Sequence, residues 1–226
     1  MKIVLIGAAS KSFGRSQIVD VLTAKELRGR SVTFSLVDWD EAALDRMVRF
    51  AIAVKDRTGT DVEIEHTTDR THALRGADYV ILSVARKRME LWEQDFRVPL
   101  SHGFRHCLGE NGGPGAVSHA LRSLELVIPI CRDVEEICPD ALVMNFTNPE
   151  ARVLHAICHL TQVNAAGFCH GVFGAIRALS SYLDRPVKQL EVISAGMNHF
   201  YCVLRVTDKE TGEDLLKTAV RRAVED

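Results

Sequence analysis

The sequence lacks the features that would place it in several common classes. It contains no Cys-x-x-Cys pair and no His-Glu-x-x-His motif, so two frequent metal and dithiol signatures are absent. It has no excess of charge, because 28 Lys and Arg stand against 30 Asp and Glu and the formal net charge is −2. Such a balance gives no global positive field for nucleic acid or an anionic membrane. No apolar run approaches the length of a transmembrane helix, and the run that follows Met1 is too short for a signal peptide. We therefore expect a small-molecule substrate and neither nucleic acid nor membrane as a partner.

The spacing and the apolar surroundings of the cysteines are typical of free thiols. The chain has six of them, none in a paired spacing, and four lie in segments with the apolar pattern of a buried helix or strand. Free thiols are typical of a reducing compartment. We therefore expect a cytoplasmic protein.

Apolar runs alternate with segments of helical periodicity along most of the chain. The predicted strands cover residues 2–6, 32–37, 62–66, 79–84, 142–146 and 164–168, and the predicted helices cover 16–27, 41–55, 71–75, 115–138, 151–160 and 172–183. This alternation predicts an α/β fold, a Rossmann-like doubly wound parallel sheet.

A glycine-marked turn follows the first predicted strand. Of the three glycines of G-x-G-x-x-G, the run Gly7-Ala8-Ala9-Ser10-Lys11-Ser12 keeps the first, although Ala9 is small enough for close approach of the backbone. Asp38 ends the second strand, where a carboxylate accepts hydrogen bonds from both ribose hydroxyls and repels a 2′-phosphate, which favours NAD over NADP. The candidate cofactor residues of these segments are Gly7, Ala9, Ser10, Phe13, Asp38 and Ser83. An ordinary α/β domain with a glycine in its first turn is the alternative on these residues alone.

The pattern changes near residue 187. Residues 190–195 and 200–207 predict paired strands, and 214–224 predict a helix for whose apolar face the remaining sequence offers no partner. We therefore expect residues 1–186 to form the NAD-binding domain. Residues 187–226 would be the beginning of a second, α+β domain for substrate binding or dimerisation, cut short in this chain.

Three further segments contain candidate site residues. Asn145-Phe146-Thr147-Asn148-Pro149 follows an apolar strand at the edge of the sheet where ligands bind, and Leu108–Gly115 is a glycine-rich loop that contains Glu110. A plain turn and a surface loop are the alternatives. Cys169 and His199 each follow a predicted strand and are a soft thiolate and an imidazole suited to a transition metal. The spaced pairs His102 with His106 and His155 with His159 lack the glutamate of a zinc-protease helix, and we do not take them as ligands.

In this order, these elements resemble glycoside hydrolase family 4. The resemblance rests on Gly7-x-x-Ser10, Asp38, Glu110, the Asn-Phe-Thr-Asn-Pro run, Gly167-Phe168-Cys169-His170-Gly171 and Gly196-Met197-Asn198-His199. It implies an enzyme that uses NAD and usually Mn²⁺, with Cys169 and His199 as metal ligands. It also implies that Asn148 contacts substrate and cofactor and that Glu110 binds sugar hydroxyls. His170 is similar to the residue in members that act on unphosphorylated α-glycosides, such as α-glucosidases, α-galactosidases and uronidases.

The resemblance also implies a reaction and an assembly. NAD⁺ takes a hydride from C3 of the sugar, the metal polarises the new carbonyl, a base removes the C2 proton, and the glycosidic oxygen leaves by elimination. Water then adds and NADH returns the hydride. A homo-oligomer is expected. Family members are about twice as long, and the tyrosine base lies in their other half, so no residue here is assigned as that base.

The sequence departs from the family's pattern at two positions, and two other functional classes share part of that pattern. Ala9 stands where family members commonly have a glycine, and Met197 stands where they usually have a leucine. A lactate- or malate-dehydrogenase-like oxidoreductase would share the sheet and the cofactor, with Arg86, Arg88 and His170 imitating its catalytic groups, but it would leave Cys169 without a role. A non-catalytic NAD-binding subunit would bind the cofactor without turning over a glycoside.

Overall fold

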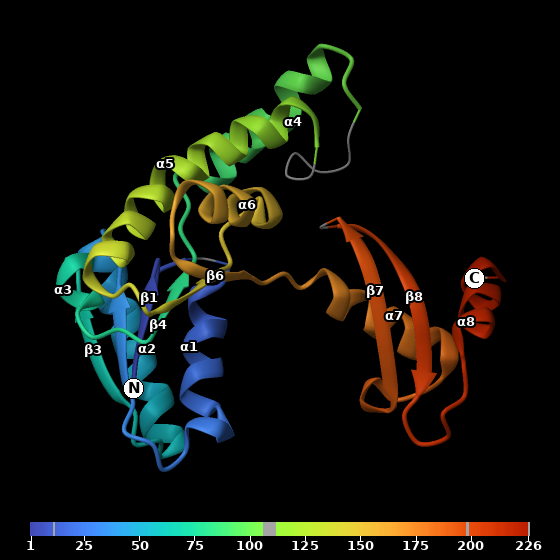
Figure 1. Cartoon of the computed structure of the whole chain (residues 1–226), viewed down its shortest axis with the longest axis horizontal. Coiled ribbons are helices and arrows are strands. Elements are labelled where there is room, and N and C mark those ends of the chain that lie inside the picture. The colour runs from blue at the N-terminus through green and yellow to red at the C-terminus, as the bar shows by residue number, and fades with distance from the viewer. Residues whose placement is uncertain (11, 106–111, 198, 226) are drawn as a thin grey trace. The chain divides into compact units, whose positions relative to one another are not determined.

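The computed structural model describes residues 1–10, 12–105, 112–197 and 199–225 (Figure 1). Contacts between Cα atoms divide the chain into two compact units, Met1–Phe168 and Cys169–Asp226. Each unit has a hydrophobic core of its own, and the two are described in turn.

The first unit is built on a six-stranded parallel sheet. Its strands are β1 (Lys2–Ile6), β2 (Thr33–Val37), β3 (Glu63–Thr67), β4 (Tyr79–Leu82), β5 (Leu142–Asn145) and β6 (Asn164–Gly167). They lie in the order β3-β2-β1-β4-β5-β6, and every neighbouring pair is parallel. This is the order of a doubly wound dinucleotide-binding sheet, in which the direction of winding reverses between β1 and β4. The predicted fold class is therefore confirmed.

Helices cover both faces of this sheet, as its buried central strands require. The helices of the first unit are α1 (Gly14–Thr23), the 3₁₀ turn η1 (Lys25–Leu27), α2 (Glu41–Thr58), α3 (Arg70–Leu74), α4 (Arg88–Ser101), α5 (Gly113–Ile137) and α6 (Glu150–Leu160). One core joins α1 and α2 to the sheet through side chains such as Ile18, Phe34 and Leu44. The other joins α3, α5 and α6 to it, with Val80 and Val127 fully buried.

Helix α4 was absent from the sequence-based prediction. It contains Pro99 in its last turn, and several of its apolar side chains, including Met89 and Val98, are exposed, so its sequence shows no clear apolar stripe. It is held instead by α5, because the buried carboxylate of Asp95 forms an ion pair with Arg122 and Gly115 lies close to the Asp95 carbonyl. A tertiary ion pair of this kind leaves no local signal in the sequence.

The second unit packs two helices on a β-hairpin. It consists of α7 (Gly171–Leu183), the 3₁₀ turn η2 (Val187–Gln189), β7 (Leu190–Met197), β8 (Phe200–Asp208) and α8 (Leu216–Glu225), with β7 and β8 antiparallel. Its core contains Leu183, Leu190, Val206, Leu215 and Ala219. The last helix finds its partners earlier in the chain and not in the remaining sequence, because α8 packs on α7 and β8.

The division of contacts falls before α7, whereas the sequence pattern places the domain change near residue 187. Helix α7 lies with the hairpin because Leu183 enters the same core as Leu190 and Val206. The assignment of 1–186 and 187–226 to two functional domains stays a prediction. Over the described residues, no helix combines the length and the apolar character needed to cross a membrane.

Candidate cofactor and metal sites

The turn after β1 has the backbone geometry of a nucleotide-binding turn. Gly7 has φ +90°, and a Cβ atom there would lie 2.2 Å from the carbonyl oxygen of Ser83, the residue that follows β4. Only glycine tolerates both conditions. The turn therefore brings the chain to the point between β1 and β4 at which open α/β sheets bind ligands.

Asp38 lies against this turn. Its side chain is 9% exposed, and its carboxylate accepts a hydrogen bond of 2.9 Å from the backbone N–H of Ala9 and one of 3.2 Å from that of Asp40. The two bonds fix the carboxylate at the end of β2 and leave further lone pairs on its oxygens. Those lone pairs suit a pair of sugar hydroxyls.

A second glycine of this turn was missed by the sequence analysis. Gly14 is the first residue of α1, and a Cβ atom there would lie 2.2 Å from the carbonyl oxygen of Ala8. It allows α1 to approach the turn after β1 closely, as the third glycine of the motif allows a helix to approach its strand, and it lies two residues further along than the usual spacing. Because the spacing differs, a search for G-x-G-x-x-G could not find it.

The other members of the predicted cofactor set lie around the same edge of the sheet. Ser10 donates its N–H to the carbonyl of Gly7 at 2.9 Å, and its hydroxyl accepts the N–H of Phe13 at 3.4 Å. Ser83 is 4% exposed and donates its N–H to the carbonyl of Ile6. The first turn of α1 is thereby tied to the glycine turn, and the end of β4 to the end of β1.

In the Asn-Phe-Thr-Asn-Pro run, Asn145 and Thr147 hold the backbone in place, and Asn148 is the candidate ligand-binding residue. Asn145 is fully buried and closes a turn, because its side chain accepts the N–H of Thr147 and donates to the carbonyl of the same residue. The Thr147 hydroxyl accepts the N–H of Val84 at 3.1 Å. Asn148 precedes a cis-proline, and its carbonyl accepts the Ser123 hydroxyl at 2.5 Å. The run thus fixes Asn148 next to the loop that follows β4.

Three phenylalanines line the same edge of the sheet. The ring of Phe146 stacks on that of Phe168, with centroids 5.2 Å apart and planes inclined by 12°, and Phe13 lies 5.9 Å from Phe146. Phe168 follows β6 and is 39% exposed. These rings form an apolar wall beside the glycine turn. Phe13 is among the predicted cofactor residues. The roles of Phe146 and Phe168 were missed, although both lie in runs that carry the family resemblance.

In the second unit, the structure brings Cys169 and His199 together. The sulfur of Cys169 lies 3.3 Å from Nε2 of His199, although the two residues are 30 positions apart. His199 has φ +58°, a left-handed backbone that a non-glycine residue adopts only where its surroundings hold it. The Gly171 N–H donates to the same sulfur at 3.4 Å. The two predicted ligands therefore share one site.

The separation of these two atoms fits a common metal ion. A zinc-like ion about 2.3 Å from sulfur and about 2.1 Å from nitrogen separates them by about 3.1 Å at a right angle and about 3.6 Å at the tetrahedral angle. The observed 3.3 Å lies between these limits. Among the described residues, no group of three or more His, Cys, Asp or Glu side chains could hold a metal.

His170 and Glu110 are the two other predicted substrate residues. His170 is exposed and lies directly before α7, and its carbonyl accepts the N–H of Gly174 at 3.2 Å. Glu110 lies outside the described residues. Of the histidine pairs set aside, His155 and His159 stand on α6 with ring centroids 4.1 Å apart, and Nδ1 of His159 bonds the carbonyl of His155.

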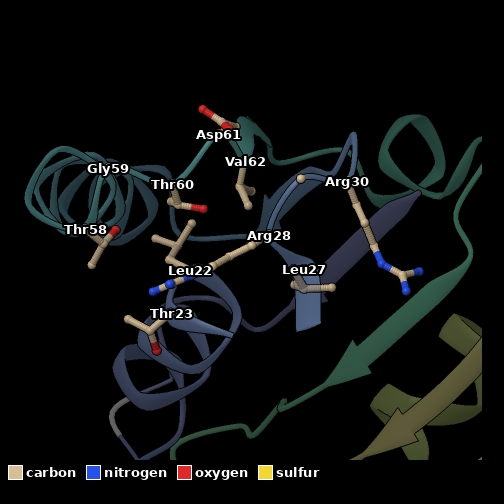
Figure 2. Close-up of a pocket in the computed structure, with 11 residues that line it drawn as sticks. Leu22, Thr23, Leu27, Arg28, Arg30, Thr58, Gly59, Thr60, Asp61 and Val62 are labelled. Carbon is tan, nitrogen blue, oxygen red and sulfur yellow. The ribbon is translucent and has the colours of Figure 1, made fainter. Parts of the chain in front are cut away.

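A hollow on the first unit lies away from these residues. Figure 2 shows it between the end of α1, the η1 turn and the segment after α2, with Arg28, Thr58 and Asp61 among its lining residues. These segments precede β2 and β3, so the hollow lies at the amino ends of the strands. Ligands of open α/β sheets bind at the carboxyl ends, and we do not take this hollow as a cofactor site.

The sheet order, the two close-approach glycines and the carboxylate that ends β2 define a dinucleotide-binding type of α/β fold. The chain belongs to family 4 of the glycosyl hydrolases, whose family model matches residues 2–185.

Two curated relatives have names that fit this family. An α-glucosidase of Erwinia rhapontici is 34% identical over 223 residues, which are 94% of this chain and 47% of that protein. An α-galactosidase of Bacillus subtilis is 32% identical over 225 residues, 99% of this chain and 51% of that protein. The chain therefore spans about half the length of these relatives.

Solved structures show the same fold. A 6-phospho-α-glucosidase from gut microorganisms, in complex with NAD and Mn²⁺, superposes with a TM-score of 0.87 at 20% identity, over 100% of this chain and 51% of that one. A lactate dehydrogenase from Eimeria maxima, with NADH and oxamate, gives 0.70 at 15% identity over 97% of this chain and 60% of that one.

Proposed function

We propose that this chain is the cofactor- and metal-binding part of a glycosidase that cleaves unphosphorylated α-glycosides by transient oxidation of the sugar. The observation that carries the proposal is the 3.3 Å approach of Cys169 and His199 in a family 4 chain that also has the glycine turn and Asp38. A glycosidase of the usual two-carboxylate type needs neither a thiolate nor a nucleotide turn. The combination is explained by redox chemistry on the sugar.

The residues of the first unit would hold NAD. The glycine turn allows a pyrophosphate to approach the backbone closely at the amino end of α1, where the helix dipole favours negative charge, and the free lone pairs of Asp38 suit the ribose hydroxyls. The apolar wall of Phe146 and Phe168 offers a dry surface for the nicotinamide ring. Asn148, fixed by its carbonyl bond to Ser123, would contact both cofactor and sugar.

The residues of the second unit would hold the metal and the sugar oxygens. Cys169 as thiolate and His199 through Nε2 would bind a divalent ion such as Mn²⁺. When bound, NAD⁺ and the metal supply a hydride acceptor and a Lewis acid for oxidation at C3, elimination, addition of water and re-reduction. Glu110 would bind sugar hydroxyls, and no described residue is assigned as the base.

The choice of an unphosphorylated α-glycoside rests on His170. The run Cys169-His170-Gly171 resembles that of family members that act on unphosphorylated α-glycosides, and His170 is exposed beside Cys169. The α-glucosidase and α-galactosidase names of the relatives support this choice, whereas a neighbouring structure is a 6-phospho-α-glucosidase. We also propose a cytoplasmic location, which the free described cysteines support, and a homo-oligomer.

The test is a matched pair of substrates. The purified chain is incubated with NAD⁺, Mn²⁺ and a reductant, and nitrophenolate release is followed from p-nitrophenyl α-glycosides and from their 6-phosphates, with and without a chelator. Release that needs NAD⁺ and metal and prefers the unphosphorylated glycosides is the expected result. Preference for the 6-phosphates would overturn the substrate assignment.

Two further outcomes would replace the proposal. NADH formation from a 2-hydroxy acid without any metal would indicate a dehydrogenase, a class with which the chain shares its fold. NAD⁺ binding without turnover under any metal would indicate a non-catalytic subunit.

A further inference from the structure

Tyr201 lies beside the pair formed by Cys169 and His199. It is the second residue of β8, and its hydroxyl donates a hydrogen bond of 2.7 Å to the carbonyl of Gly171, the first residue of α7. A Cβ atom on Gly171 would lie 3.5 Å from the Tyr201 ring and 3.7 Å from the Cys169 sulfur. The ring and the sulfur therefore flank the same glycine.

The backbone of Gly171 is bonded on both sides. Its N–H donates to the Cys169 sulfur at 3.4 Å, and its carbonyl accepts from Tyr201. A shift of Gly171 would move the N–H that touches the sulfur. The Tyr201 hydroxyl thus restrains, through one residue, the position of a predicted metal ligand.

Tyr201 also belongs to the segment that carries the other ligand. His199 lies two residues before it, in a left-handed turn between β7 and β8. The opposite partner of Tyr201 in the hairpin is Gly196, so the tyrosine is itself held in register. One side chain thereby joins the two segments, distant in sequence, from which Cys169 and His199 come.

We propose that Tyr201 is a positioning residue of the metal site, which holds the segment Cys169–Gly171 at the separation from His199 that a metal ion requires. The inference rests on the proposed function, because it presumes that Cys169 and His199 bind metal. Groups that orient metal ligands commonly change metal affinity by about 10- to 100-fold when they are removed. The hydroxyl acts through a backbone carbonyl, so we expect the lower end of that range.

The test replaces Mn²⁺ by Co²⁺, whose bond to a thiolate gives a charge-transfer absorption band. Tyr201→Phe removes the hydroxyl and keeps the ring. Tyr182→Phe, on the same unit near the end of α7, is the matched control, and Cys169→Ser defines the spectrum without the thiolate. We expect Tyr201→Phe to bind Co²⁺ about tenfold more weakly and to shift the band, while Tyr182→Phe binds it as the wild type does. The unfolding midpoint without metal should be similar in the two tyrosine variants.

The outcomes separate the two claims. A wild-type chain without a thiolate band would overturn the metal site and the role of Tyr201 with it. A wild-type band with equal affinity and equal spectrum in Tyr201→Phe would overturn the positioning role alone. A lower unfolding midpoint in Tyr201→Phe with an unchanged band would show a purely structural tyrosine and would also overturn it.

Discussion

The buried imidazole of His119 makes the stability of the first unit sensitive to acid. His119 lies on α5 with 7% of its surface exposed, in the electrostatic surroundings of Asp95 and Arg122, the ion pair that joins α4 to α5. Burial lowers the pKa of His119 from 6.5 to about 4, outweighing the opposite effect of Asp95. The folded protein therefore keeps this histidine neutral where the unfolded chain protonates it.

The direction and the size of the pH effect on the free energy of unfolding follow from proton linkage. Between about pH 6.5 and about pH 4 the unfolded chain binds the extra proton, so the free energy of unfolding falls as the pH falls through this window. At about 1.4 kcal/mol for each pKa unit, the fall from 6.5 to about 4 corresponds to about 3 kcal/mol lost by His119 alone. Above about pH 6.5 the residue is neutral in both states and contributes no pH dependence.

The assay is denaturant unfolding at about pH 7 and about pH 4.5, applied to the wild type and to His119→Gln. The wild type should lose about 2 to 3 kcal/mol more than the variant between the two conditions. Acid also protonates Asp69, Glu135 and Asp208, whose pKa values hydrogen bonds lower, but this loss is common to both proteins. His102→Gln, which alters an exposed histidine, should behave as the wild type. Parallel losses in the wild type and in His119→Gln would show that His119 does not cause the sensitivity to acid.

Three other predictions follow from the described geometry. Gly14→Ala puts a Cβ atom 2.2 Å from a carbonyl oxygen, so it should lower the free energy of unfolding by about 1 to 3 kcal/mol and weaken NAD⁺ binding. Gly174→Ala, at a helical position with open space, should raise the free energy of unfolding by about 0.4 to 1 kcal/mol. Denaturant titration compares the two variants, and a stabilised Gly14→Ala would contradict the assigned role of Gly14. Asp38→Asn should weaken NAD⁺ binding by about tenfold or more, measured by calorimetry, because charge-assisted bonds to the ribose contribute about 1.5 to 3 kcal/mol; unchanged affinity would remove Asp38 from the site. Burial raises the pKa of the Cys131 thiol to about 12, so iodoacetamide followed by mass spectrometry should label exposed Cys202 well before Cys131, and early labelling of Cys131 would show that its core opens.

The sheet was predictable because its signal is local. Apolar runs bounded by turn residues gave six strands close to their observed bounds, and the alternation with helices gave the doubly wound class. The first glycine and Asp38 were found because their place, at the ends of β1 and β2, follows from the strands themselves. The positions of such residues in the site can be predicted from the sequence alone.

What was missed depends on tertiary contacts. Helix α4 is held by the ion pair between Asp95 and Arg122, and Gly14 shows its close approach to Ala8 only once α1 is placed on the sheet. The apolar face of α8 finds its partners on α7 and β8, which lie earlier in the chain, where a search of the remaining sequence could not find them. The place of Tyr201 beside the predicted metal ligands depends on its hydrogen bond to Gly171, 30 residues away in the sequence, which no local pattern shows.

We propose that this chain serves a glycosidase that oxidises its sugar before the glycosidic bond breaks. The most direct measurement is the incorporation of deuterium at C2 of the sugar product when the chain acts on a p-nitrophenyl α-glycoside in deuterated water. If the sugar is oxidised first, deuterium enters at C2, and this incorporation depends on NAD⁺ and on a divalent metal and is lost in Cys169→Ser. Hydrolysis without deuterium at C2, or hydrolysis that proceeds without NAD⁺, would contradict the proposal.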